Sequence, residues 1–190
     1  MGLTLAKVSL LAVVLDMASA ATLQTAPVPP PAEQQTADCS APVFATDQLV
    51  CGDGALRALD SELARALAAG ALPNSPWFES QSQWFLRRSR CAFAEDHNAC
   101  AKAAYRERLA LLGNLDPKTK VLEARCDDAA IAAVAVKDDQ IFLLDRQRRI
   151  IGAAATRSGG SSWQTFLTAQ RRGRMLIVTT REGASLQCTL

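Results

Sequence analysis

Six cysteines and a single histidine are the first residues of this chain to suggest chemistry. Cys91, His97 and Cys100 lie close enough in the sequence to supply three ligands of a zinc site. An even number of cysteines in an exported chain favours disulfides instead, because an oxidising compartment removes the thiolates that zinc needs. We therefore expect no metal and no cofactor, and we assign all six cysteines to disulfides.

The spacing of the cysteines narrows how they pair. Two pairs would each close a short local loop, and a third would bracket the C-terminal segment: Cys39 with Cys51, Cys91 with Cys100, and Cys126 with Cys188. We predict these three pairs. The crossed pairing of Cys39 with Cys91 and Cys51 with Cys100 remains an alternative, because helices packed side by side can bring such positions together.

The residue sets of hydrolases are missing from the chain. It has no Gly-x-Ser-x-Gly motif, and His97 is its sole imidazole. The carboxylate pairs Asp127-Asp128 and Asp138-Asp139 are adjacent residues, which point apart in strands and turns, whereas glycosidases need facing carboxylates. We predict that the protein is not an enzyme. Nothing in the chain resembles a nucleic-acid-binding module, so we expect no nucleic-acid partner.

A small polar stretch, Ser158-Gly159-Gly160-Ser161-Ser162, precedes Trp163. A plain loop between two strands accounts for it. A protruding loop that enters the cleft of a partner accounts for it as well, and gives a role to Arg171-Arg172-Gly173 at the next predicted turn. A guanidinium group at that turn is suited to pair with the catalytic carboxylates of a glycosidase.

The N-terminus predicts export. Lys7 is followed by a short apolar run that ends in Ala18-Ser19-Ala20, the small residues that signal peptidase requires. We expect a signal peptide over 1–20, cleaved near Ala20, and a soluble periplasmic or secreted protein that does not span the membrane. The residue directly after the predicted cleavage point is alanine and not cysteine, so we expect no lipid anchor on an N-terminal cysteine. Residues 21–37 are rich in proline and glutamine and predict an extended linker.

Helical periodicity extends over 38–113. Leucines at three- and four-residue steps predict an amphipathic helix over 54–68 with Asp53 as its N-cap. A shorter helix is expected around 44–51. Ser75-Pro76 has the form of a cap with proline at the first helical position, so we expect it to begin the helix that carries Trp84.

The run 81–109 predicts two helices joined by a disulfide. Asn98 is expected to cap the second helix, and Gly113 to end it in a left-handed conformation. Ala101, Tyr105, Leu109 and Leu112 then share the apolar face. Lys102, Arg106 and Glu107 are expected to face water.

From Thr119 the pattern changes to short β-type runs separated by turn residues at 138–139, 145–148, 158–161, 170–173 and 181–183. Such runs predict an antiparallel sheet, curled into a barrel that a Cys126–Cys188 disulfide would close. The predicted fold class is α+β in two small domains. A disulfide-stapled all-α domain over 38–113 precedes an antiparallel β-barrel-like domain over 119–190.

The helical segment resembles the lysozyme inhibitor LprI-like N-terminal domain family over residues 38–112. The resemblance rests on Cys39, Cys51, Cys91 and Cys100 and on the motif residues Gln81, Trp84, Arg88, Tyr105 and Arg108. Asp47 stands where the family prefers glutamate. The resemblance implies an exported, non-enzymatic protein whose partner is lysozyme.

Residues 122–190 are similar, more loosely, to the MliC family of lysozyme inhibitors, which are antiparallel β-barrels. Cys126 and Cys188 match the bridging cysteines of that family, Ser158-Gly159 with Trp163 matches its Ser-Gly loop and aromatic residue, and Arg172-Gly173 stands in place of its Lys-Gly. In that family the serine and the lysine enter the lysozyme active site. The resemblance thus implies a lysozyme-binding role for Ser158, Gly159, Trp163, Arg172 and Gly173.

These observations together predict an exported protein that binds and inhibits a c-type lysozyme or related muramidase through a loop of the β domain. The alternative is a structural or interaction module of the cell envelope that binds an anionic cell-wall polymer or another envelope protein. Its proposed surface is an arginine-rich edge made of Arg87, Arg88, Arg90, Arg106 and Arg108.

Overall fold

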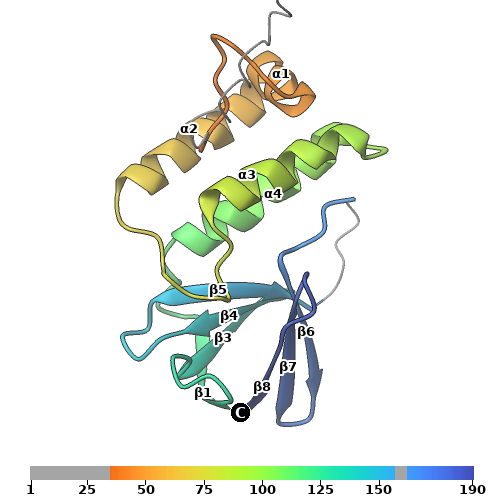
Figure 1. Cartoon of the computed structure of the whole chain (residues 1–190). Helices are drawn as coiled ribbons and strands as arrows, with labels where there is room; N and C mark the ends of the chain where they lie inside the picture. The colour runs from red at the N-terminus through yellow and green to blue at the C-terminus, as the bar shows by residue number, and fades with distance from the viewer. Residues whose placement is uncertain (1–34, 157–161) are drawn as a thin grey trace, which may run out of the picture. The chain divides into compact units, whose positions relative to one another are not determined.

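Helices come first along the chain and strands follow, as the sequence predicts (Figure 1). This computed structural model describes residues 35–156 and 162–190, which fall in one compact unit. The helices are α1 (Ala45–Gly52), α2 (Gly54–Ala68), α3 (Gln81–Ser89), the 3-10 helix η1 (Arg90–Phe93) and α4 (His97–Leu112). Among the described residues, no helix combines the length and the apolar character that crossing a membrane requires.

The first two helices form where the sequence places them. The side chain of Asp53 caps α2 by accepting hydrogen bonds from the backbone N–H groups of Ala55 (2.8 Å) and Leu56 (3.0 Å). Leu56 and Leu63 are fully buried along the predicted apolar face of this helix. The Asp53 cap and the leucines at three- and four-residue steps were therefore sufficient to predict α2 from the sequence.

The start of α3 was predicted wrongly. Ser75 accepts a hydrogen bond from the N–H of Trp77, but no helix follows there; Ser80 is the N-cap, bonded by the N–H of Gln83 at 3.2 Å. Trp77 and Phe78 instead pack into hydrophobic clusters of the sheet. Burying these two aromatic side chains on the sheet holds the segment out of the helix that Ser75-Pro76 would otherwise begin.

The ends of α4 also differ from the prediction. Asp96, not Asn98, is the N-cap, and it accepts from the N–H of Ala99 at 2.8 Å. The Asn98 amide instead donates to the Asp53 carboxylate, also at 2.8 Å. Gly113 ends the helix with φ −82°, which is not left-handed. Glu107 is buried rather than turned to water, because it accepts hydrogen bonds from the β segment described below.

All three predicted disulfides are present: Cys39–Cys51, Cys91–Cys100 and Cys126–Cys188. The crossed alternative is therefore wrong. The first two disulfides brace the helical part, and the second spans the joint between η1 and α4. Such bridges limit the unfolded chain and so stabilise a part whose core is small.

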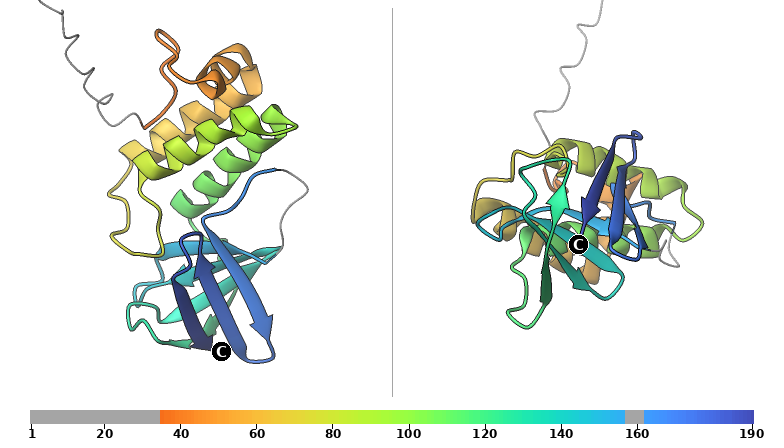
Figure 2. Two further views of the ribbon diagram at one scale, coloured as in Figure 1. Left: turned by 45° about the vertical axis from the view of Figure 1, so that its right-hand side comes forward. Right: turned by 90° about the horizontal axis from the view of Figure 1, so that it is seen from below.

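The β segment forms one sheet of eight strands in the order β1-β3-β4-β5-β6-β7-β8-β2. Their bounds are β1 Lys120–Glu123, β2 Arg125–Cys126, β3 Ala133–Lys137, β4 Gln140–Leu144, β5 Ile150–Ala155, β6 Leu167–Arg172, β7 Met175–Thr180 and β8 Ser185–Thr189. The two edge strands are consecutive in sequence, with only Ala124 between them. The sheet therefore curls into a nearly closed barrel (Figure 2). Its bridging residues Cys126 and Cys188 are direct cross-strand partners.

One strand pair departs from the predicted antiparallel arrangement. β5 and β6 run parallel, with Ala154 beside Leu167 and Ala155 beside Thr168. The predicted strand around 162–169 begins only at Leu167, and it continues through Arg172 to a turn at Gly173-Arg174. The preceding residues 162–166 leave the sheet because Trp163 packs against the helices, and this detour returns the chain parallel to β5.

The barrel is buried on both faces where helices cover it. Leu143 and Ile151 point into the inner cluster of the barrel, whereas Phe142 and Leu144 lie in an outer cluster with Phe78 and Leu111 of the helical part. In β8, by contrast, buried and exposed residues alternate. Continuous apolar strands β3 to β5 therefore mark the helix-covered side, and alternating strands mark the solvent side.

Candidate functional site

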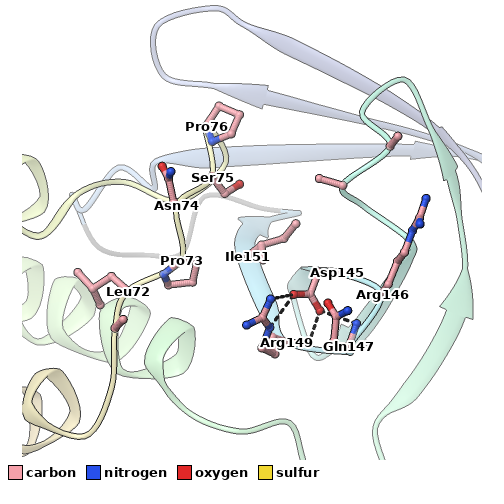
Figure 3. A pocket seen from close by; sticks show the side chains of 13 residues that line it. Leu72, Pro73, Asn74, Ser75, Pro76, Asp145, Arg146, Gln147, Arg149 and Ile151 are labelled. Atoms are coloured by element: carbon pink, nitrogen blue, oxygen red, sulfur yellow. Dashed lines mark hydrogen bonds and ion pairs between the residues drawn. The ribbon is translucent and has the colours of Figure 1, made fainter.

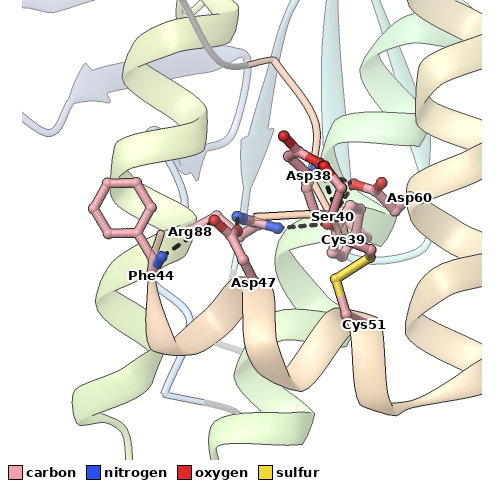
Figure 4. Close-up of a disulfide and its surroundings, with 10 residues drawn as sticks. Asp38, Cys39, Ser40, Phe44, Asp47, Cys51, Asp60 and Arg88 are labelled. Carbon is pink, nitrogen blue, oxygen red and sulfur yellow. Dashed lines mark hydrogen bonds and ion pairs between the residues drawn. A yellow bond between two sulfur atoms is a disulfide. The ribbon is translucent and has the colours of Figure 1, made fainter. Parts of the chain in front are cut away.

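The family-motif residues lie inside the helical part. Arg88 and Asp47 are both fully buried and form an ion pair (Figure 4). Arg88 also donates to the hydroxyl of Tyr105 at 2.6 Å, and that hydroxyl donates to Asp60 at 2.7 Å. Burial raises the pKa of Tyr105, so its hydroxyl keeps the proton that this chain of hydrogen bonds requires.

A second motif pair continues this network. Arg108, fully buried, donates from Nε to the side-chain oxygen of Gln81 at 2.8 Å and from Nη1 to the carbonyl of Glu79 at 2.9 Å. Burial lowers the pKa of Arg108 to about 10. Gln81 in turn donates to the carbonyl of Gln35, and the N–H of Ala37 donates to Asp60. The motif therefore holds the helices together and fixes residues 35–37 against them.

This burial corrects the arginine-rich edge proposed from the sequence. Arg87, Arg88 and Arg108 are 8%, 0% and 0% exposed, so they cannot contact a polymer; only Arg90 and Arg106 of the set lie on the surface. The helical spacing in the sequence already indicates that Arg88 and Arg108 are buried. Arg88 follows Trp84 by four residues and Arg108 follows Tyr105 by three, so both arginines share the helix face of buried aromatic residues.

Residues 162–166, which we call the strap, join the barrel to the helices. Trp163 is 8% exposed and donates from its indole nitrogen to Glu107, while the N–H of Phe166 donates to the same carboxylate at 3.3 Å. The guanidinium of Arg87 lies 4.0 Å from the centroid of the Trp163 ring and also donates to the carbonyl of Gln164. The strap is thus anchored by one aromatic ring and one buried ion network.

Two carboxylates share Arg87 in this network. Glu79 accepts from Arg87 Nε at 2.8 Å, and Glu107 lies 3.7 Å from Arg87 Nη1. Burial raises the pKa of Glu107, although the charge of Arg87 and the N–H groups of Trp163 and Phe166 act in the opposite direction. Sequence reasoning missed both glutamates. For Glu107 the reason is that its donors Trp163 and Phe166 are 56 and 59 residues away in the chain.

The predicted lysozyme-binding residues are not gathered in one place. Ser158 and Gly159 lie outside the described residues, as does the predicted signal peptide. Trp163 is buried at the helix-facing end of the barrel. Arg172 and Gly173 are exposed at the β6–β7 hairpin, where Gly173 has φ +61°. This hairpin lies beside the C-terminus, at the end of β6 opposite the strap (Figure 1).

The metal site weighed from the sequence is not formed. Cys91 and Cys100 are joined to each other, so neither sulfur is a thiolate ligand. His97 Nε2 lies 2.9 Å from the hydroxyl of Thr46, and burial lowers the pKa of the His97 imidazole. Across the part of the chain that the structure describes, no three potential ligands cluster in a way that could hold a metal ion.

A cavity of about 620 Å³ lies between the α2–α3 connector and the β4–β5 turn (Figure 3). Pro73, Pro76 and Ile151 give it apolar walls. Asp145 is engaged by its own turn, accepting from the N–H of Gln147 and from Nε of Arg149. No predicted site residue lines this cavity, and its carboxylate is already satisfied, so it adds nothing to the predicted site.

Comparison with known proteins finds relatives of about half of this chain. Lipoprotein LprI of Mycobacterium bovis is 39% identical to this chain over 101 residues, and the same holds for lipoprotein LprI of two Mycobacterium tuberculosis strains. Half of this chain is LprI-like. The similarity covers 50% of the chain and 51% of each relative, so the chain spans about half the length of the curated relatives that it matches.

The LprI-like resemblance predicted from the sequence is therefore confirmed for about half of the chain. No family model matches the chain, and no solved structure matches it significantly. The resemblance of the barrel to the MliC family accordingly stays a prediction. So does the assignment of Ser158, Trp163 and Arg172 to a lysozyme interface.

Proposed function

We propose that this is an exported, non-enzymatic protein that binds and inhibits a c-type lysozyme or a related muramidase. The observation that carries the proposal is the LprI-like similarity, at 39% identity over half of the chain. Three disulfides and no free cysteine among the described residues fit an oxidising compartment outside the cytoplasm. The signal peptide ending near Ala20 and the division into domains at 38–113 and 119–190 belong to the same proposal.

In this proposal the β6–β7 hairpin supplies a cation to the lysozyme cleft. Arg172 is exposed next to the turn at Gly173-Arg174, and a guanidinium can bind a carboxylate through two parallel hydrogen bonds. Glycosidases carry a pair of carboxylates at the scissile bond, so such a cation would compete with substrate. Ser158 and Gly159 lie outside the described residues, so their contact with lysozyme stays a separate prediction from the sequence.

The test is lysis of a peptidoglycan suspension by a c-type lysozyme, with and without the purified oxidised protein. We expect the parent protein to inhibit lysis, and Arg172→Ala to weaken inhibition by about tenfold or more, the loss typical of a central charged contact. Arg106→Ala is the matched control, since Arg106 is an exposed arginine on α4, away from the hairpin. If the Arg172→Ala variant inhibits lysis as well as the parent does, the hairpin is not part of the lysozyme-binding site.

Failure of the parent to inhibit at micromolar concentration would contradict the proposed function itself. The alternative, an envelope module that binds an anionic polymer, was based on the arginine-rich edge. Three of the five arginines of that edge are buried in ion pairs and hydrogen bonds, so the edge no longer supports it. No other observation favours that alternative.

A further inference from the structure

The β6–β7 hairpin is held in one conformation. Arg172 and Met175 are cross-strand partners, so only Gly173 and Arg174 form the turn, and Gly173 has φ +61°. Two-residue turns of this kind follow the natural twist of the strands that they join. The turn is also bonded to the end of β8, because the N–H of Leu190 donates to the carbonyl of Arg174 at 2.8 Å and Arg174 Nε donates to the backbone oxygen of Leu190 at 2.7 Å. Arg172 is thus presented on a rigid support.

Met175 lies beside Arg172 on the outer face of the barrel. In β7 the side chains of Leu176 and Val178 point into the inner cluster, so those of Met175 and Ile177 point outward. Directly paired residues of neighbouring strands have Cβ atoms about 4.5–5.5 Å apart. Met175 is 47% exposed, so a partner that covers this face and reaches Arg172 also meets the Met175 side chain.

The face around Met175 is apolar at its centre and polar at its rim. Ile177 adds partly exposed apolar surface two residues along β7. Uncharged polar side chains flank these two residues on the neighbouring strands, Gln170 on β6 and Gln187 and Thr189 on β8. Protein–protein interfaces have an apolar core and a polar rim, and they are enriched in methionine and arginine and depleted of aspartate and glutamate. The composition of this face therefore favours a protein partner.

Carboxylates lie only at the margins of this face. The nearest acidic residues are on other strands or turns: Asp127 after β2, Glu123 on β1, Glu182 in the β7–β8 turn, and Asp138 and Asp139 in the β3–β4 turn. Asp127 accepts from a backbone N–H of β8 at 3.2 Å and is two residues from Arg125, and Glu123 forms an ion pair with Arg148. The β3–β4 turn is bonded to the end of β5, on the other side of β6 from β7. Arg172 therefore makes no ion pair with any described residue, and its charge is available to a partner.

We propose that the face of Met175, Ile177 and Thr189 extends the lysozyme-binding site beyond Arg172, with Met175 as its apolar anchor. This inference rests on the proposed function and deepens it, because it concerns the same site. A stable interface takes about 800 Å² from each partner, more than Arg172 and a two-residue turn can supply. The outer face of β7 and β8 is continuous with Arg172. It is therefore the surface that the rim of the cleft covers when Arg172 enters the cleft.

The experiment measures the affinity of a c-type lysozyme for the immobilised full-length mature protein. We expect Met175→Ala to weaken binding by about three- to tenfold, and Met175→Leu, which keeps the apolar volume, to stay within about twofold of the parent. Leu86→Ala is the matched control, because Leu86 is a 57% exposed apolar side chain on α3, in the helical part. Its affinity should also stay within about twofold of the parent.

Both replaced side chains are exposed, so the variants should fold, and equal melting temperatures will verify it. If the parent binds lysozyme and Met175→Ala or Leu86→Ala binds as the other does, the extended surface is wrong while the proposed function stands. If the parent does not bind lysozyme, both fail. Gel filtration without lysozyme tests the other occupant: if the parent is a dimer that Met175→Ala converts to a monomer, a second copy covers the face and our choice of partner is wrong.

Discussion

The helical part and the barrel build their cores from different chemistry. The core of the helices contains two fully buried arginines, Arg88 and Arg108, with hydrogen-bonded partners on other helices and connectors. The inner core of the barrel is apolar and mostly aliphatic, with Leu143, Leu167 and Leu176 at 0% exposure. Aliphatic packing tolerates many arrangements, whereas a buried ion pair accepts one geometry. We infer that the short helices depend on polar partners to select their arrangement.

The largest effect is expected from breaking the polar core. Arg88→Met leaves Asp47 as an unpaired buried charge and should lower the free energy of unfolding by about 3–5 kcal/mol. Arg90→Met, two residues along and exposed, is the control and should change it by no more than about 0.5 kcal/mol. Urea denaturation of both variants measures the difference.

A double variant separates the cost of the unpaired charge from the loss of packing. Adding Asp47→Asn to Arg88→Met neutralises the carboxylate, so it should recover part of the lost stability. If Arg88→Met costs no more than Arg90→Met, the contrast between the two cores is wrong.

Much of the helical part was predictable, because its signals are local. The cap at Asp53, the leucine period of α2 and the short spacing of the cysteines each involve residues close in sequence, and all were confirmed. The burial of Arg88 was missed because residue type was given more weight than position. Its four-residue step from Trp84 had already placed it on the inner face.

The contacts between helices and barrel were not predictable from local pattern. Trp77 comes from the helical segment and packs in the barrel core, while Trp163 comes from the β segment and packs among the helices. Each tryptophan also donates to a carboxylate across the boundary, Trp77 to Asp128 and Trp163 to Glu107. Partners more than fifty residues apart leave no periodic signal, so the strap and the start of α3 were placed wrongly.

A substitution at Gly152 tests the apolar contact between the helical segment and the barrel, where Trp77 packs on β5. A Cβ atom there would lie 2.7 Å from the carbonyl oxygen of Trp77 and 3.1 Å from its Cβ. Gly152→Ala should therefore force Trp77 off β5 and lower the free energy of unfolding by about 1–3 kcal/mol. At Gly52, the last residue of α1, a Cβ meets nothing within 4 Å.

Gly52→Ala is thus the control of opposite sign, because alanine in a helix is favoured over glycine by about 0.5–1 kcal/mol. Denaturant titration compares the two variants. Equal effects would mean that the connector can move away from the barrel without loss, and that the two cores are independent.

The smallest effect concerns the polar contacts between helices and barrel, which Glu107 makes with the strap. It is a pH dependence of the free energy of unfolding. Because burial raises the pKa of Glu107 above its ordinary 4.5, the folded protein binds this proton more readily than the unfolded chain. The contribution of Glu107 to stability is therefore fully present below that ordinary value, and it is lost as pH rises through the folded pKa. Measured from pH 4 to 8, the advantage of the parent over Glu107→Gln should shrink as pH rises.

Two further variants sharpen this prediction. Trp163→Phe keeps a ring on Arg87 but removes an N–H donor that favours the charged carboxylate, so the loss should move to higher pH. Gln48→Ala, an exposed and non-titrating position on α1, gives the pH-independent baseline. An advantage of the parent over Glu107→Gln that grows with pH would show that Arg87 and the two N–H donors outweigh burial. The strap would then be held by a fully charged network, and the boundary would resemble the ion-paired helical core more than the barrel.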